Sequence, residues 1–158
     1  MTEFIAAMAN AATGVTVVVT DGPGGRMAQT ISAMCSVSAD PPTLLVAVNR
    51  RSPLTGVMAI NKVFCVNVLA EHQAYIADTF AGRRGERSYD FGGASWRDPM
   101  LLAESAASFS CVLARTIAVG THLLFVGEVT GSSASGHAPL AYHDRGYRRL
   151  TTSEETYR

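Results

Sequence analysis

Apolar and polar positions along the chain predict mostly β-structure. The β-branched run at residues 14–20, GVTVVVT, is typical of a strand, and the turn residues DGPGG follow it at 21–25. Such a tight connection returns the chain antiparallel, so we expect the next strand over residues 27–38. Residues 43–49 are apolar at nearly every position, which predicts a strand buried on both faces.

The rest of the chain continues this pattern, with short helices between strands. We expect helices from Thr2 to Gly14, at 53–61 and at 71–81, and strands at 62–70, 107–116, 122–130, 140–142 and 147–150. The sequence GSSASG at 131–136 predicts a flexible hairpin loop. Residues 82–99 are irregular and carry four arginines, so we expect a mobile loop there. The tail at 153–158 is expected to fray.

This element order predicts a mainly β, barrel-like fold with a few short helices. The chain shows no internal repeat and no linker, so we expect a single domain over residues 1–158. The glycines of DGPGG lack the GxGxxG spacing and precede no helix, which argues against a Rossmann dinucleotide site.

Composition narrows the function classes. The 158 residues include 13 Lys and Arg and 13 Asp and Glu, and this neutral balance argues against nucleic-acid binding. The low charged fraction of 16% indicates a covered surface and therefore a homo-oligomer. We identify no signal peptide, and no apolar run approaches the roughly 18–20 residues that span a bilayer.

The cysteines and histidines do not predict a metal site. Cys35, Cys65 and Cys111 all lie in apolar, strand-like segments, so we expect buried free thiols in a reducing cytosol. The chain contains no CxxC or HExxH, and His137 and His143 lack ligand spacing.

The run MAQTISAMCSVSADPP, at residues 27–42, is the strongest candidate for a binding site. Small side chains let a flat ligand approach the backbone, and hydroxyls and amides bind polar ring edges or a phosphate. The next strand ends in Asn49, Arg50 and Ser52, where a helix N-terminus and an arginine would favour a phosphate. An ordinary strand and turn rich in Ser and Thr would show a similar pattern.

Two later segments also carry candidate residues. His122 begins an apolar strand after a Gly-Thr turn, either as a polar residue at a strand edge or as a functional group. Residues 142–150 mix aromatics with arginines. They form either a solvated edge strand or a strand end that turns Arg145 and Tyr147 towards a ligand.

The ordered elements TDGPGG, TISAMCSVSADPPTLLVAVNRRS, FCVNVLAEHQ, GTHLLFVGEV and LAYHDRGY resemble the short-chain flavin reductase family. Its members are reductase components of two-component flavin monooxygenases, such as the 4-hydroxyphenylacetate 3-monooxygenase reductase. The resemblance runs from about Met8 to Leu150. The S-V-S-x-D-P-P and G-T-H elements are specific together, in this order and spacing.

This resemblance implies an FMN-binding split β-barrel, usually a cytoplasmic homodimer with flavin near the subunit interface. Such a protein is an NAD(P)H:flavin oxidoreductase that reduces FMN or FAD with NADH or NADPH. Reduced flavin then diffuses to a separate monooxygenase. Two alternatives stay open: a flavoprotein that reduces a metal centre (corrinoid cobalt or a ferric chelate), and a non-catalytic flavin-binding protein.

The resemblance also implies site residues by matching position. The residues expected to line the flavin ring and ribityl chain are Thr30, Ile31, Ser32, Cys35, Ser36 and Val37. Asn49, Arg50 and Ser52 would lie near the phosphate, although the adjacent Arg51 leaves open which arginine meets it. His122 would lie near flavin and nicotinamide as the catalytic residue, and Arg145 and Tyr147 would approach the same cleft. Ala33 stands where many members carry serine.

The mechanism expected from this resemblance needs little from titrating side chains. The cofactors carry the hydride chemistry, and the protein holds the nicotinamide C4 about 3–3.5 Å from flavin N5. Backbone N–H groups at 32–37 would stabilise charge on the pyrimidine end, and His122 would orient the dinucleotide. Arg83, Arg84 and Arg87 would either meet a 2′-phosphate or form a solvated loop.

Overall fold

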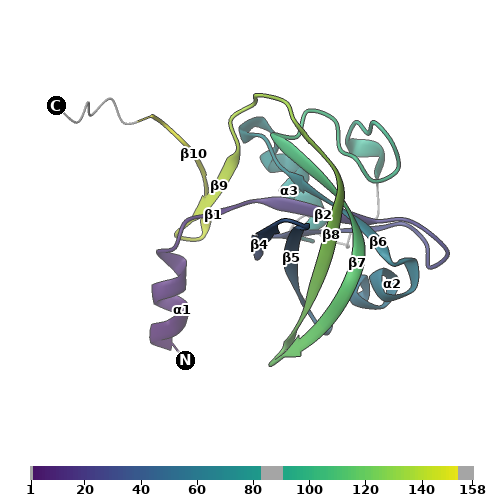
Figure 1. Cartoon of the computed structure of the whole chain (residues 1–158). Helices are drawn as coiled ribbons and strands as arrows, with labels where there is room; N and C mark the ends of the chain where they lie inside the picture. The colour runs from purple at the N-terminus through teal and green to yellow at the C-terminus, as the bar shows by residue number, and fades with distance from the viewer. Residues whose placement is uncertain (1, 83–90, 153–158) are drawn as a thin grey trace.

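The computed structural model describes residues 2–82 and 91–152. Its main element is an antiparallel sheet of seven strands in the order β3-β2-β6-β7-β8-β5-β4 (Figure 1). The strands are β2 (Thr16–Thr20), β3 (Met27–Ile31), β4 (Met34–Ala39), β5 (Pro42–Asn49), β6 (Val63–Val68), β7 (Ala107–Val119) and β8 (His122–Ala134). The expected mainly β fold is confirmed.

The two edges of this sheet belong to consecutive strands. Only Ser32 and Ala33 separate β3 from β4, yet β3 pairs with β2 and β4 pairs with β5. The Ala47 N–H donates to the Ala33 carbonyl at 2.9 Å, so the link also contacts β5. The sheet therefore closes on itself as a split barrel. The single strand expected over 27–38 is wrong, because its two halves pair with different partners.

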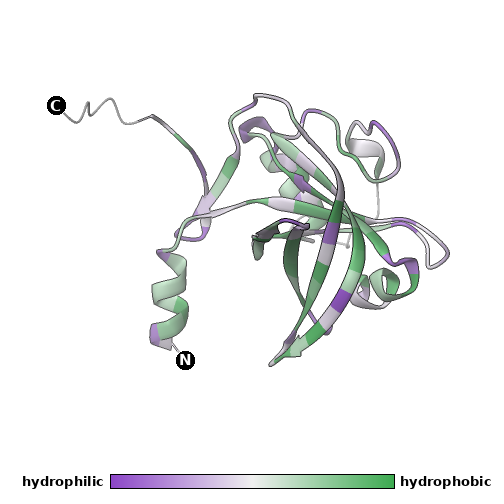
Figure 2. Ribbon diagram, in the orientation of Figure 1, coloured by the Kyte–Doolittle hydropathy of each residue, from purple (hydrophilic) through white to green (hydrophobic). Residues whose placement is uncertain are grey.

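A second, smaller sheet lies beside the barrel. It contains β1 (Thr13–Gly14), β9 (Leu140–His143) and β10 (Gly146–Arg149), with β9 in the centre. Helix α1 (Thr2–Ala9) is shorter than expected, buries none of its residues and lies away from the barrel (Figure 1). Figure 2 shows that α1 is nevertheless mostly hydrophobic, and Phe4, Ile5 and Met8 are exposed.

The remaining helices are short and follow the sequence signals. Helix α2 (Pro53–Asn61) begins at the expected proline, with Ser52 as its N-cap, and ends at Lys62 in the left-handed conformation. The expected helix at 71–81 appears as the 3-10 turn η1 (Glu71–Gln73) followed by α3 (Ala74–Phe80). A further 3-10 turn, η2, spans Phe91–Gly93.

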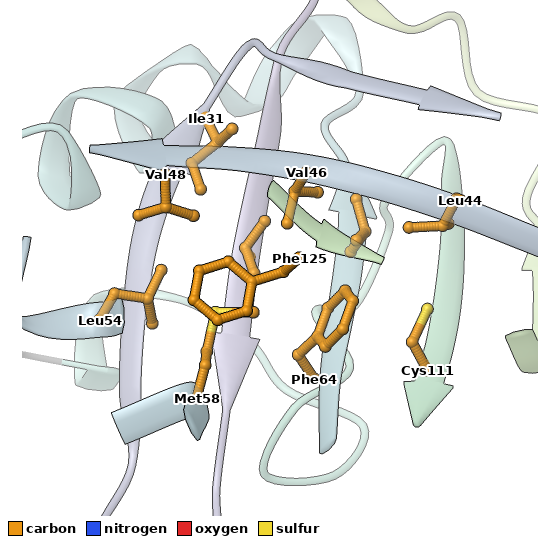
Figure 3. Packing of buried hydrophobic residues seen from close by; sticks show 11 residues of the cluster. Ile31, Leu44, Val46, Val48, Leu54, Met58, Phe64, Cys111 and Phe125 are labelled. Carbon is orange, nitrogen blue, oxygen red and sulfur yellow. The ribbon is translucent and has the colours of Figure 1, made fainter. Parts of the chain in front are cut away.

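Two hydrophobic clusters lie on opposite faces of β2. The first fills the barrel, where side chains of β5 and α2 converge on Phe125 and Phe64 (Figure 3). The second lies between β2 and α3, with Val17, Val19 and Phe80 among its members. All five residues of β2 are buried, whereas β5 alternates between buried and half-buried positions. The prediction that β5 is buried on both faces is therefore wrong.

Long-range pairing extends β7 and β8 beyond the predicted strands. Gly131 to Ala134 belong to β8 and pair with the start of β7, from Ser110 to Ala107. The flexible hairpin loop expected at 131–136 is therefore wrong over these four residues. They are small enough to continue the strand, and β7 supplies a partner for them. The turn between the two strands is Gly120 and Thr121.

The described part of the 82–99 segment is packed rather than loose. The ring centroids of Phe91 and Trp96 lie 5.4 and 6.2 Å from the ring centroid of Phe80. The Trp96 indole N–H donates to the Phe91 carbonyl. Residues 91–99 are irregular, as expected, and the mobility expected of this loop stays a prediction. Residues 83–90, with Arg83, Arg84 and Arg87, lie outside the described residues, as does the tail at 153–158.

Over residues 2–82 and 91–152, none of the helices combines the length and the apolar composition needed to cross a membrane.

Gly127 provides a test of the barrel packing. A Cβ at this position would lie 2.5 Å from Cζ of Phe64 and 2.8 Å from Cβ of Cys111, both buried. We expect Gly127→Ala to lower the free energy of unfolding by about 1–3 kcal/mol, measured by urea denaturation. Gly131→Ala, on the same strand, is the control, because its Cβ would meet only Ser110, at 4.0 Å. Equal denaturation midpoints for the two variants would contradict this packing.

Candidate functional site

A cavity of about 390 Å³ lies where β3, the start of α2 and the end of α3 meet. Strand β3 supplies one wall and the turn between β5 and α2 supplies the second. The last turn of α3 and the residues after it supply the third. The lining residues are Met27, Ala28, Gln29, Thr30, Asn49, Arg51, Ser52, Pro53, Thr79, Phe80, Ala81 and Gly82.

The turn between β5 and α2 forms the polar end of this cavity. Asn49 Oδ1 accepts the Arg51 N–H at 2.9 Å, and the Asn49 carbonyl accepts the Ser52 N–H at 2.9 Å. Ser52 Oγ then caps α2 by accepting the Leu54 N–H at 3.2 Å. Both Arg50 and Arg51 are exposed, and of the two only Arg51 lines the cavity. An arginine beside a helix N-terminus favours an anion such as a phosphate.

Hydrogen bonds hold the three walls together. The Thr30 hydroxyl donates to the Ala77 carbonyl at 2.7 Å, which fixes β3 against α3. The Ser52 hydroxyl donates to Gln29 Oε1, which joins the start of α2 to β3. Two of the sequence candidates, Thr30 and Ser52, therefore face one cavity from different elements.

A second cavity of about 160 Å³ adjoins the first, because both are lined by Thr30 and Ala81. Its other lining residues are Val15, Ser32, Tyr142 and Tyr147. The Tyr147 hydroxyl donates to Asp78 Oδ1 at 2.9 Å, so β10 is tied to α3. The structure thus brings the candidates Ser32 and Tyr147 next to Thr30.

His122 lies close to the polar end of the first cavity. It begins β8 and pairs directly with Asn49 at the end of β5. Thr121 Oγ1 lies 2.9 Å from its Nδ1, a hydrogen bond that holds the half-buried ring. Nε2 is the ring nitrogen outside this bond.

Five other candidates line neither cavity. Cys35, Ser36 and Val37 are exposed on the edge strand β4, where the pairing with β5 shifts around Val37. The Ile31 side chain is buried in the barrel cluster. Arg145 is exposed at the tip of the β9–β10 hairpin, with φ of 59°.

An aromatic cluster supports the wall that Phe80 provides. The Arg26 guanidinium lies 3.8 Å from the Phe91 ring centroid and 4.7 Å from that of Trp96, and both rings contact Phe80. Arg26 Nε donates to the Pro99 carbonyl at 2.7 Å. Burial lowers the pKa of Arg26, although Asp21 and Asp98 oppose this shift.

Two of the thiols are unsuited to act as nucleophiles. Burial raises the pKa of Cys65, and it raises the pKa of Cys111 to about 12. The expectation of three buried thiols is wrong for Cys35, which is exposed on the edge strand. In the part of the chain that the structure describes, no three His, Cys, Asp or Glu residues are grouped to hold a metal ion.

Sequence reasoning missed Gln29 and the end of α3 as lining residues, and it left open whether Arg50 or Arg51 meets the phosphate. No local pattern marks them, because their position depends on contacts such as Thr30 with Ala77, which lie 47 residues apart. Asn49 and Ser52 could be predicted as site residues from the sequence, since a strand end followed by Ser-Pro predicts a helix N-terminus.

Known proteins of similar sequence and structure include flavin reductases. A family model described as flavin reductase like domain matches residues 8–151. The FMN reductase (NADH) RutF 1 of Methylorubrum extorquens is 41% identical over 154 residues, with 93% of this chain and 75% of the relative covered.

Two solved structures agree with this match. BorF, the flavin reductase component of a bacterial two-component tryptophan halogenase, is 30% identical with a TM-score of 0.84, covering 96% of this chain and 99% of its own. The NADH:FAD oxidoreductase SgcE6 of Streptomyces globisporus is 25% identical, with a TM-score of 0.85. The match covers 96% of this chain and 93% of the SgcE6 chain.

Proposed function

Since this chain belongs to the flavin reductase-like domain family, we propose that it reduces free FMN with NADH and releases the reduced flavin. It is an NAD(P)H-dependent flavin reductase, and FMN with NADH is the pair that the name of the Methylorubrum relative gives. The metal-centre reductase and the non-catalytic flavoprotein are not favoured, because the relative and both structural neighbours are flavin reductases.

The cavity between β3, α2 and α3 is the observation that carries this proposal. Its volume of about 390 Å³ falls within the roughly 300–1,000 Å³ of small-molecule sites. Asn49, Arg51 and Ser52 make one end polar, while Ala28, Phe80 and Ala81 are apolar. FMN has the same division between a phosphate and a flat ring, so these residues fit it.

We assign the phosphate to the turn between β5 and α2. Ser52 and Asn49 would contact it there, with Arg51 as the arginine that lines the cavity and the adjacent Arg50 as a second positive charge. The ring would extend past Thr30 towards Ser32 and Tyr147, into the adjoining cavity.

Backbone groups of residues 32–37 would bind the polar edge of the ring. Because β4 is an edge strand, one side of its backbone faces no partner strand in the described chain, at Cys35, Ser36 and Val37. Such N–H groups stabilise negative charge without titrating at working pH. The bound flavin itself supplies the hydride-accepting chemistry.

His122 is proposed to orient the nicotinamide rather than to move a proton. Its hydrogen bond with Thr121 fixes the ring, and its pairing with Asn49 places the histidine beside the phosphate end of the cavity. Fixed orientation of two reactants is a large part of the rate enhancement in hydride transfer.

The assembly is proposed to be a homodimer. Apolar side chains are exposed on α1, at Phe4, Ile5 and Met8, and on β7, at Val112, Ile117 and Val119. Burying them against a second copy would lower the free energy of the pair. Arg145, at its exposed hairpin tip, is then available to a flavin at the subunit interface.

The acceptor of the reduced flavin is proposed to be a separate monooxygenase in the cytoplasm. The neighbour BorF serves a two-component enzyme, which supports a division of labour through diffusible flavin. The exposed Cys35 thiol suits a reducing compartment. Residues 1–158 would act as a single reductase domain.

The direct test of this function is NADH oxidation, followed by absorbance, with flavin-stripped protein. We expect no oxidation without flavin, rapid oxidation with FMN, and saturation at micromolar FMN. Heat-denatured protein is the control. Flavin that stays bound through gel filtration while no nicotinamide is oxidised would contradict the proposal.

His122→Ala tests the role of the histidine. Loss of one hydrogen bond should raise the KM for NADH about tenfold and slow flavin reduction, with the dissociation constant of FMN unchanged. His137→Ala, which removes an exposed histidine from a loop that lines neither cavity, is the control and should match the parent protein. Loss of FMN binding with normal hydride transfer would show that this role is wrong.

A further inference from the structure

Gln29 lines the cavity with a polar side chain to which the proposed flavin binding assigns no role. It lies on β3, is half-buried, and lines the cavity beside Thr30 and Ser52. The Ser52 hydroxyl donates its proton to Gln29 Oε1. This bond joins β3 to the N-cap residue of α2, at the end of the cavity assigned to the phosphate.

The hydrogen-bonding capacity of Ser52 is almost used up. A serine hydroxyl has one proton and two lone pairs. The Leu54 N–H takes one lone pair, and the proton goes to Gln29. A phosphate brings mainly acceptor oxygens, so it needs donors at this corner.

The carboxamide of Gln29 can supply that donor. With Oε1 on the Ser52 hydroxyl, its NH₂ group carries two further donors into the same cavity wall. When the amide turns over, Nε2 meets Ser52 Oγ, and the hydroxyl proton is released towards a ligand. Either arrangement leaves at least one uncharged donor in the cavity that Arg51 also lines.

We propose that Gln29 is a specificity-determining residue that makes the site select flavins with a terminal phosphate monoester. This inference rests on the proposed function. Gln29 positions the Ser52 hydroxyl, and its neutrality leaves the attraction of Arg51 for the phosphate unopposed. The site should therefore prefer FMN to riboflavin, which has the same ring and no phosphate.

A carboxylate at this position separates selectivity from a structural role. Glutamate has nearly the shape of glutamine, so it still accepts the Ser52 hydroxyl and keeps β3 joined to α2. Its negative charge, however, opposes both Arg51 and the incoming phosphate. A residue that only joined two elements would leave the ratio of FMN to riboflavin unchanged.

The test measures KM and kcat for FMN and for riboflavin with NADH. The parent protein should have a lower KM for FMN than for riboflavin. In Gln29→Glu, the KM for FMN should rise at least about tenfold, while the KM for riboflavin should stay within about twofold of the parent value. Added salt should reduce the difference in the KM for FMN between this variant and the parent protein. Asn10→Asp makes the same change of charge at an exposed position on no cavity wall and should leave both values unchanged.

Gln29→Met covers the case in which the glutamate variant does not fold. It removes the carboxamide without adding charge, and it should also lower the preference for FMN. An unchanged ratio of the two KM values in the folded variants would overturn the inference, as would a parent protein with no preference for FMN. Failure of the parent protein to reduce either flavin would instead overturn the proposed function.

Discussion

The arrangement of this molecule depends on a two-residue link. Ser32 and Ala33 join strands that lie at opposite edges of a seven-stranded sheet, so the sheet must curl until those edges meet. The barrel then has a seam rather than a continuous wall. At this seam, β3 faces α2 and α3, and the cavity lies among these three elements. Barrel closure and the site are therefore one geometric feature.

Side-chain hydrogen bonds fix the cavity walls where strand pairing does not. Thr30 holds β3 to α3, Ser52 with Gln29 holds β3 to α2, and Tyr147 with Asp78 holds β10 to α3. The second hydrophobic cluster supports α3 from behind, because Val17 and Val19 of β2 face it while Val18 faces the barrel. A polar site can persist here because its walls rest on two separate apolar cores.

Local signals predicted much of the fold and part of the site. The β-branched run of β2, the Ser52 cap and the proline of α2 all act over a few residues, and the structure contains each. The break at Ser32, the length of β8 and the choice of Arg51 over Arg50 as a lining residue could not be predicted. They depend on partners far along the chain, as when Asn49 pairs with His122.

The central claim is that the flavin phosphate lies at the start of α2, with the ring directed along β3. A crystal structure of the protein grown with FMN tests this most directly. The account predicts the phosphate against Ser52 and Arg51 and the ring between Thr30, Ser32 and Tyr147. A flavin bound elsewhere, for example against the exposed face of β7 and β8, would contradict it.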